Sequence, residues 1–313
     1  MRVACIQLST GEDYNLNCSK LINFIKQSVR IKADLIITPE ASTILSINKK
    51  KVFNYSYSMK SDPIIKKIKL ISKKNKKWIL IGSLFIKERK KLRNRSIMIN
   101  PKGEIEAFYD KINMFDVSLS KTETHNESET FVSGKRLKVV NLPWGKLGLT
   151  ICYDLRFPEL FRNLSKRNLN FISVPSAFTK TTGKRHWITL LKARAIENFC
   201  YIFAPAQTGK NNTKRETFGH SAIISPDGKI LKLNKDSLKI DQAIISHHWT
   251  LGQEINTPSF FQRNQYLINV CKEISYKYDV LLIRGITPKQ KIIYDNCDIK
   301  KKYFLMVGSL NDS

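Results

Sequence analysis

Residues 147–160 contain the side chain best suited to act as a nucleophile. An apolar, strand-like run ends at Cys152, and a helix is predicted to begin near Pro158. At such a turn, backbone N–H groups and the helix dipole can lower the pKa of a thiol, and the N–H of Tyr153 is free to stabilise an oxyanion. We therefore expect Cys152 to be a nucleophile, although a structural cysteine on a buried strand gives the same local pattern.

A cysteine nucleophile needs a base to take its proton and a cation or donor for the oxyanion. Glu40 follows Pro39 at the end of the apolar run 35–37, where α/β sheets place functional side chains. Lys111 is the single lysine of the apolar and aromatic segment 108–116. Taken alone, such a glutamate is commonly a cap and such a lysine commonly faces solvent, so the hypothesis depends on their combination with Cys152.

Together these segments resemble the carbon–nitrogen hydrolase (nitrilase) superfamily. The Glu-Lys-Cys triad of that superfamily falls in the same order, in motifs that match residues 39–40, 109–116 and 152–159. The resemblance covers about residues 1–265 and is closest to the branch of deaminated glutathione amidases and ω-amidases. The segments that carry this closer resemblance are 175–179, 182–187, 193–198 and 218–221, and segment 204–209 is nearer to the deaminated glutathione amidases.

The resemblance implies a role for each member of the triad. Glu40 is the general base, Cys152 forms a thioester, and Lys111 stabilises the tetrahedral intermediate together with the N–H of Tyr153. Glu40 then activates the water that releases the acid. Glu127 matches a further family glutamate that orients Lys111 or the substrate amide, unless it is an exposed loop acid. No metal and no organic cofactor is implied.

The resemblance also implies residues that bind the substrate. Arg156 lies four residues after the nucleophile, where related amidohydrolases hold a substrate carboxylate, and a planar guanidinium suits that bidentate contact. The structural alternative is an ion pair of Arg156 with Glu159 or Glu197. The other residues predicted to bind the substrate are Tyr153, Ser176, Thr179 and His186, although a His-Trp pair that opens a helix can serve packing alone.

The reaction implied is hydrolysis of a linear amide on a small metabolite that carries a carboxylate. Deaminated glutathione is the preferred substrate and an ω-amide of a 2-oxo acid the second, while nitrile and N-carbamoyl substrates remain open within the superfamily. A different class of function is a non-catalytic protein that binds polyanions or RNA. The chain departs from its relatives at Asn113, where they have a histidine, so an imidazole near the lysine is lost.

Alternating strand-like and helix-like segments must position these residues. Apolar runs predict strands, and apolar residues at helical spacing predict helices. The main strands are expected at 3–8, 35–37, 78–83, 92–100, 146–152 and 171–175, and the main helices at 14–32, 63–74, 158–166 and 186–198. This order predicts one α/β domain over residues 1–265, and the resemblance implies a four-layer αββα sandwich. Residues 266–313 form a C-terminal extension of unknown role, with a helix-like stretch at 267–276 and strand-like stretches at 280–283 and 303–307.

Composition and charge reduce the number of possible classes of function. The formal net charge is +28, from 54 Lys and Arg and 26 Asp and Glu, but the basic residues are scattered, which argues against specific nucleic-acid binding. The apolar runs are too short to span a membrane, and the start lacks a signal core, so we expect a cytoplasmic protein. Six cysteines without ligand spacing predict neither a metal site nor disulfides. The resemblance suggests a homodimer.

Overall fold

The structure is a computed structural model that describes residues 1–89, 91–118, 124–235, 240–244, 280–284 and 303–307 of the 313-residue chain. The chain divides into two compact units, Met1–Ile255 and Asn256–Ser313. The boundary expected at residue 265 and the helix-like stretch at 267–276 lie outside the described residues. All the residues that are candidates for catalysis or binding lie in the first unit.

Two six-stranded sheets form the centre of the first unit. The first sheet has the order β16 (Ile240–Ile244), β1 (Arg2–Ile6), β2 (Leu35–Ile37), β3 (Trp78–Glu88), β4 (Lys91–Ile99) and β5 (Ile105–Asp110). The second has the order β8 (Lys138–Leu142), β9 (Gly145–Leu149), β10 (Phe171–Ser173), β11 (Tyr201–Ala204), β14 (Ser221–Ile224) and β15 (Ile230–Asn234).

The two sheets share one topology. The three neighbouring strands β1, β2 and β3 of the first sheet are parallel, and so are β9, β10 and β11 of the second. In each sheet, the strands that flank these three pair with them in antiparallel orientation. Parallel strands point their carboxyl ends to the same edge of a sheet, so the loops after β2 and after β9 begin at corresponding edges. These two loops carry Glu40 and Cys152.

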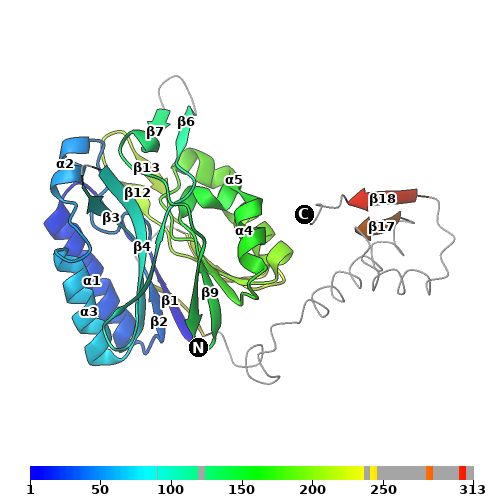
Figure 1. Cartoon of the computed structure of the whole chain (residues 1–313), viewed down its shortest axis with the longest axis horizontal. Coiled ribbons are helices and arrows are strands. Elements are labelled where there is room, and N and C mark those ends of the chain that lie inside the picture. The colour runs from blue at the N-terminus through cyan, green and yellow to red at the C-terminus, as the bar shows by residue number, and fades with distance from the viewer. Residues whose placement is uncertain (90, 119–123, 236–239, 245–279, 285–302, 308–313) are drawn as a thin grey trace. The chain divides into compact units, whose positions relative to one another are not determined.

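Helices cover the outer face of each sheet, which makes four layers (Figure 1). α1 (Tyr14–Arg30) and α3 (Pro63–Asn75) pack on the first sheet, and α4 (Pro158–Ser165) and α5 (Lys180–Asn198) cover the second. Along β1, Ala4 and Ile6 pack toward α1 and α3, whereas Val3 and Cys5 belong to the apolar cluster that includes the second sheet. Because both faces of this strand are buried, its sequence is almost continuously apolar. The predicted αββα sandwich is confirmed.

The helix starts follow from side-chain caps. Asp13 accepts a hydrogen bond from the backbone N–H of Leu16, and Asp62 caps α3, which has Pro63 in its first turn. α5 begins at Lys180, six residues before the predicted start at residue 186. The sequence shows no helical periodicity over residues 180–185 because this segment has no large apolar side chain. Thr179 accepts a hydrogen bond from the N–H of Thr182 and so caps this helix.

Shorter elements complete the described structure. They are α2 (Lys49–Asn54), the 3-10 helices η1 (Glu127–Glu129) and η2 (Cys152–Arg156), the hairpin β6 (Asp116–Ser118) and β7 (Thr124–Asn126), and the hairpin β12 (Thr208–Lys210) and β13 (Glu216–Phe218). In the second unit, β17 (Val280–Arg284) and β18 (Tyr303–Val307) pair in parallel, as strands were predicted there. Among the described residues, no helix is long and apolar enough to cross a membrane.

Candidate active site

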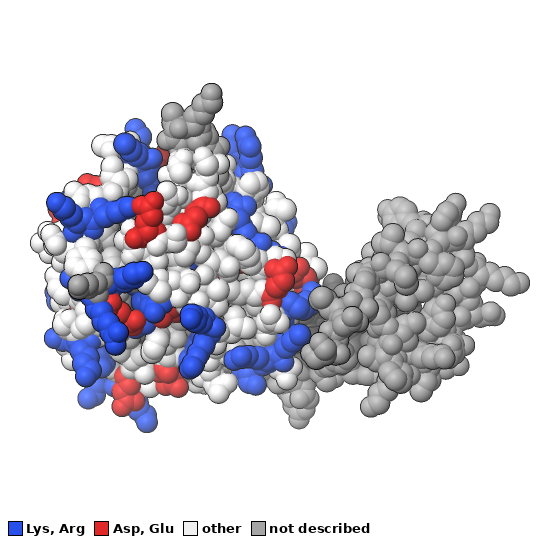
Figure 2. Space-filling model, turned by 45° about the horizontal axis from the view of Figure 1, so that its top comes forward, with Lys and Arg blue, Asp and Glu red and all other residues white. Residues whose placement is uncertain are grey.

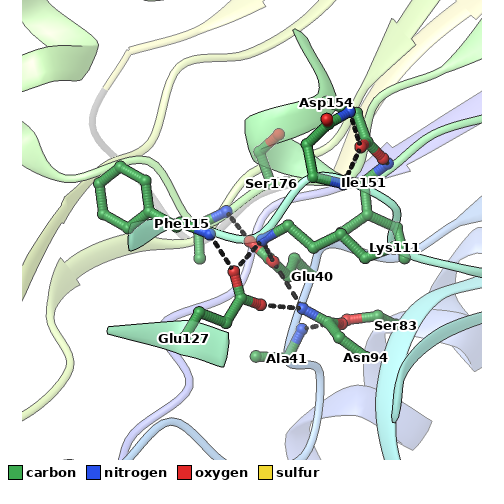
Figure 3. Close-up of polar contacts among 12 residues, drawn as sticks. Glu40, Ala41, Ser83, Asn94, Lys111, Phe115, Glu127, Ile151, Asp154 and Ser176 are labelled. Carbon is green, nitrogen blue, oxygen red and sulfur yellow. Dashed lines mark hydrogen bonds and ion pairs between the residues drawn. The ribbon is translucent and has the colours of Figure 1, made fainter. Parts of the chain in front are cut away.

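The loops that follow several strands meet at a cavity of about 340 Å³ in the first unit. Glu40 follows β2, Lys111 follows β5, and Cys152 lies two residues after β9. Glu127 comes from η1, so four residues that are far apart in the sequence line one cavity. Figure 3 shows the Lys111 ammonium group between the carboxylates of Glu40 and Glu127.

Glu40 is only 4% exposed, and its carboxylate accepts three hydrogen bonds. Oε1 accepts from Lys111 Nζ (3.0 Å) and from Asn94 Nδ2 (2.9 Å), while Oε2 accepts from the backbone N–H of Ala177 (2.9 Å). Burial raises the pKa of Glu40, but the charge of Lys111 and the polar contacts with Cys152 and Lys111 outweigh burial, so the net pKa is lowered. The carboxylate is therefore ionised at neutral pH and can accept a proton.

Lys111 is 2% exposed and forms two ion pairs. Its Nζ lies 3.0 Å from Glu40 Oε1 and 2.8 Å from Glu127 Oε2. Burial lowers the pKa of a lysine, but here the charges of Glu127 and Glu40 dominate and the pKa is raised. The site thus keeps a permanent ammonium cation out of contact with water.

Glu127 is not the exposed loop acid of the alternative interpretation, because its side chain is only 13% exposed. Besides Lys111, its Oε2 accepts the backbone N–H of Phe115 (2.8 Å), and its Oε1 accepts Asn94 Nδ2 (3.0 Å). The amide of Asn94 therefore bridges Glu127 and Glu40 (Figure 3). Asn94 was not predicted from the sequence. The one feature that could have indicated it is that an uncharged polar side chain lies within a largely buried strand.

Cys152 opens η2 with a φ of +49°, in the left-handed region that non-glycine residues rarely adopt. Its backbone N–H donates to the carbonyl of Pro175 (3.0 Å), and its side chain lines the same cavity as Glu40. Burial and the Glu40 charge raise the pKa of the thiol, which differs from the lowered pKa that the strand-to-helix turn suggested. The resting cysteine is a thiol whose proton faces a carboxylate base.

Asp154 fixes the turn that holds Cys152. This buried carboxylate accepts hydrogen bonds from the N–H of Ile151 (2.9 Å), the hydroxyl of Tyr109 (2.8 Å), and both the N–H (3.0 Å) and the side-chain amide (2.9 Å) of Asn113. Asn113, which departs from the family pattern, thus directs its side chain to Asp154. Its position links the segment after Lys111 to the turn that carries Cys152.

The residues predicted to bind substrate lie in two groups. Tyr153, Arg156 and Thr179 line the cavity. His186 and Ser176 are not among the lining residues: His186 Nδ1 lies 3.1 Å from Arg156 Nη2, and the Ser176 hydroxyl donates to the carbonyl of Val174. Arg156 forms no ion pair with Glu159 or Glu197 in the described structure, and Glu197 pairs instead with Arg194 (2.8 Å).

Arg215 is a second arginine in this cavity that the sequence analysis missed. Its Nη2 donates to the carbonyl of Ala177 (2.7 Å), the residue whose N–H donates to Glu40. Its sequence context, a basic polar loop in a lysine-rich chain, gave no signal. Among the described residues, no group of three or more His, Cys, Asp or Glu side chains is arranged to hold a metal ion.

The carbon-nitrogen hydrolase family model matches residues 2–246, which is most of the chain and includes every residue of the candidate site. The chain belongs to the carbon–nitrogen hydrolase family. It is therefore a hydrolase of carbon–nitrogen bonds other than peptide bonds.

Similar proteins agree with this assignment. A deaminated glutathione amidase of Yersinia enterocolitica is 38% identical over 240 residues, covering 75% of this chain and 83% of the relative. A protein of the same name from Dictyostelium discoideum is also 38% identical, over 76% of this chain and 84% of the relative. Among solved structures, the Caenorhabditis elegans NitFhit protein has a TM-score of 0.74 at 29% identity, covering 92% of this chain and 68% of that protein.

A second solved structure is Saccharomyces cerevisiae Nit3, described as a member of branch 10 of the nitrilase superfamily. It has a TM-score of 0.70 at 26% identity and covers 78% of this chain and 89% of that protein. These similarities confirm the prediction of a cysteine-dependent amidase of this family. They do not favour the nitrile, N-carbamoyl, ω-amidase or non-catalytic alternatives.

Proposed function

We propose that this amidase hydrolyses deaminated glutathione through a thioester on Cys152. The observation that carries the proposal is that Glu40, Lys111 and Cys152 line one cavity, in which the Lys111 ammonium group lies 3.0 Å from the buried, ionised Glu40 carboxylate. Two relatives at 38% identity bear the name deaminated glutathione amidase, which supports the choice of substrate. A volume of about 340 Å³ is within the range of small-molecule sites.

In the first half of the reaction, Glu40 takes the thiol proton as Cys152 Sγ attacks the amide carbonyl carbon. The oxygen becomes an oxyanion, which the Lys111 ammonium group and the N–H of Tyr153 stabilise. The carbon–nitrogen bond then breaks, and Glu40 returns its proton to the leaving amine. An acyl thioester on Cys152 remains.

In the second half, Glu40 takes a proton from water while the water oxygen attacks the thioester carbonyl. The sulfur leaves and regains the proton from Glu40, so the acid product and the free thiol are restored together. Glu127 keeps Lys111 charged and in place, and it transfers no proton in either half. One carboxylate therefore serves as base, acid and base in turn.

The substrate carboxylate on the acyl side binds to Arg156. Tyr153 and Phe178 place their rings 5.8 Å and 5.5 Å from the Arg156 guanidinium, which leaves its planar edge available for a bidentate contact. His186 orients Arg156 from outside the cavity, and Thr179 contributes to the wall next to it. Ser176 acts indirectly, by fixing the backbone that leads to Ala177.

We further propose the location, assembly and partners of the whole protein. It is a cytoplasmic homodimer that acts on small-molecule amides without a metal or an organic cofactor, and it binds neither specific nucleic acids nor membranes. Residues 266–313 are an accessory extension to the hydrolase domain of residues 1–265.

The test is release of 2-oxoglutarate, which hydrolysis of both deaminated glutathione and 2-oxoglutaramate produces. We expect the kcat/KM of wild-type protein to be larger for deaminated glutathione than for 2-oxoglutaramate. Hydrolysis of 2-oxoglutaramate with none of deaminated glutathione would contradict the proposed substrate and would favour an ω-amidase.

A further inference from the structure

The cavity carries more positive charge than the triad uses. Its two lining acids, Glu40 and Glu127, are both paired with Lys111. Two arginines also line it, and neither Arg156 nor Arg215 forms an ion pair with a described residue. A substrate with one carboxylate would neutralise only one of them and would leave the other guanidinium partly desolvated without a counter-charge.

Arg215 is held at the wall of the cavity by its backbone surroundings. It lies on the hairpin connection just before β13, half buried, and donates from Nη2 to the carbonyl of Ala177 (2.7 Å). Its Nε is buried and has no hydrogen-bond partner among the described residues. Its charge also lowers the pKa of Glu40, so Arg215 lies close enough to act on the reacting groups.

We infer that Arg215 binds a second substrate carboxylate, the one on the leaving-amine side of the scissile bond. The inference rests on the proposed function, because Arg156 is there assigned to the carboxylate of the acyl side. Deaminated glutathione carries a carboxylate at each end, and its leaving group is cysteinylglycine. The site therefore takes amides that are anionic at both ends, and Arg215 makes it prefer an anionic leaving group to ammonia.

A purely structural role for Arg215 has a different signature. Through Ala177 it also supports Glu40, so its replacement will slow every substrate to some extent. That loss is common to all substrates and cancels when two substrates are compared on the same variant. The informative quantity is thus a ratio of kcat/KM values for two substrates that differ only in the distal carboxylate.

The substrate pair is deaminated glutathione and its C-terminal carboxamide, in which the glycine carboxylate is neutral. For wild-type protein we expect kcat/KM to be at least about tenfold higher for the acid, because one charge-assisted hydrogen bond contributes at least this factor. In Arg215→Met this ratio falls to about one. In Lys210→Met, which removes an exposed cation from the same hairpin outside the cavity, the wild-type ratio is kept.

Each outcome separates the inference from the function on which it rests. If both substrates are hydrolysed and Arg215→Met leaves the ratio of their kcat/KM values unchanged, the inference is overturned and the amidase function stands. If wild-type protein hydrolyses neither, calorimetric titration of both compounds into folded Cys152→Ala protein decides. The inference is supported if Cys152→Ala protein binds the acid more tightly than the carboxamide and if adding Arg215→Met removes this difference. Equal binding of the two compounds, or binding of neither, overturns it.

Discussion

At the residue scale, Glu40 and Lys111 act on Cys152 in opposite directions. The Glu40 carboxylate raises the pKa of the thiol, and the Lys111 ammonium group lowers it, while burial adds to the effect of Glu40. The raised pKa keeps the resting cysteine protonated, and in the proposed reaction the carboxylate takes this proton. This arrangement protects a buried nucleophile from ionising before a substrate is present, and it makes the Glu40 charge measurable through the reactivity of the thiol.

Glu40→Gln should lower the pH at which Cys152 becomes reactive. The substitution removes the negative charge that raises the pKa of the thiol and keeps the Lys111 cation that lowers it. We expect the midpoint of alkylation by iodoacetamide against pH, read on the Cys152 peptide by mass spectrometry, to move down by about one pH unit or more. Glu129→Gln, which neutralises an exposed acid, is the control. An unchanged or higher midpoint in Glu40→Gln would contradict this assignment.

Asn94 holds both carboxylates through one amide group. Its Nδ2 donates to Glu40 (2.9 Å) and to Glu127 (3.0 Å), and its side chain is buried. Hydrogen bonds to an ionised carboxylate lower its pKa, so their loss raises it. The amide thus helps to hold both carboxylates in place and to keep Glu40 ionised.

Asn94→Ala should lower kcat by at least about tenfold, or about 1.4 kcal/mol, with a smaller change in KM. Because the Glu40 carboxylate loses a donor, the acid limb of the pH–rate profile should also move to higher pH. The matched control is Asn141→Ala, which removes an exposed asparagine from β8. If both variants had kcat values within twofold of wild type and unchanged pH profiles, Asn94 would have no positioning role.

At the element scale, the site depends on a close approach between the loops that leave the two sheets. Gly82 of β3 lies where these loops meet, since a Cβ at this position would lie 1.9 Å from the carbonyl oxygen of Thr38 and 2.6 Å from Pro175 Cβ. Thr38 precedes the Glu40 turn, and the Pro175 carbonyl accepts the N–H of Cys152. A side chain at this glycine would therefore displace the base and the nucleophile together.

Gly82→Ala should destabilise the fold by about 3 kcal/mol or more, because the atoms that the new methyl group meets belong to backbone or to rigid proline. Urea unfolding followed by circular dichroism measures this loss. In the control Gly11→Ala, the new Cβ would lie 3.2 Å from one carbonyl oxygen, and the cost should be smaller. Equal stabilities of the two variants would show that the loops can separate without cost.

The sequence predicted the elements better than it predicted their meeting point. Periodicity located α1, α3 and α4, and apolar runs located β1, β2 and β10, because each element buries its own apolar residues. The first turn of α5 was missed because its residues are polar and its start depends on the Thr179 cap.

At the whole-molecule scale, the three residues of the proposed triad could be located from sequence, but the side chains that contact them could not. Glu40, Lys111 and Cys152 lie in distinctive local patterns, and the structure brings them to one cavity. Asn94 and Arg215 have ordinary sequence surroundings and enter the site only through the packing of the two sheets and the β12–β13 connection. Their contributions are tertiary, so no local pattern could have revealed them.

The charge of the whole chain is also informative at this scale. On the face that Figure 2 shows, Lys and Arg side chains are scattered with acids between them, rather than gathered in one stripe. This distribution fits a solvated basic surface, whose attraction to polyanions is weakened by salt. The positive charge that we propose to act in the reaction lies inside the cavity, on Lys111, Arg156 and Arg215.

The central claim is that Cys152 carries the acyl group, and the most direct test follows both the acyl group and the turnover. Wild-type protein mixed briefly with deaminated glutathione and quenched in acid should carry one acyl group on the Cys152 peptide in mass spectrometry. Cys152→Ala should lose turnover by about 10⁴-fold or more, while Cys18→Ala, which alters a buried cysteine of α1 outside the cavity, keeps it. Near wild-type turnover by folded Cys152→Ala protein would contradict the account.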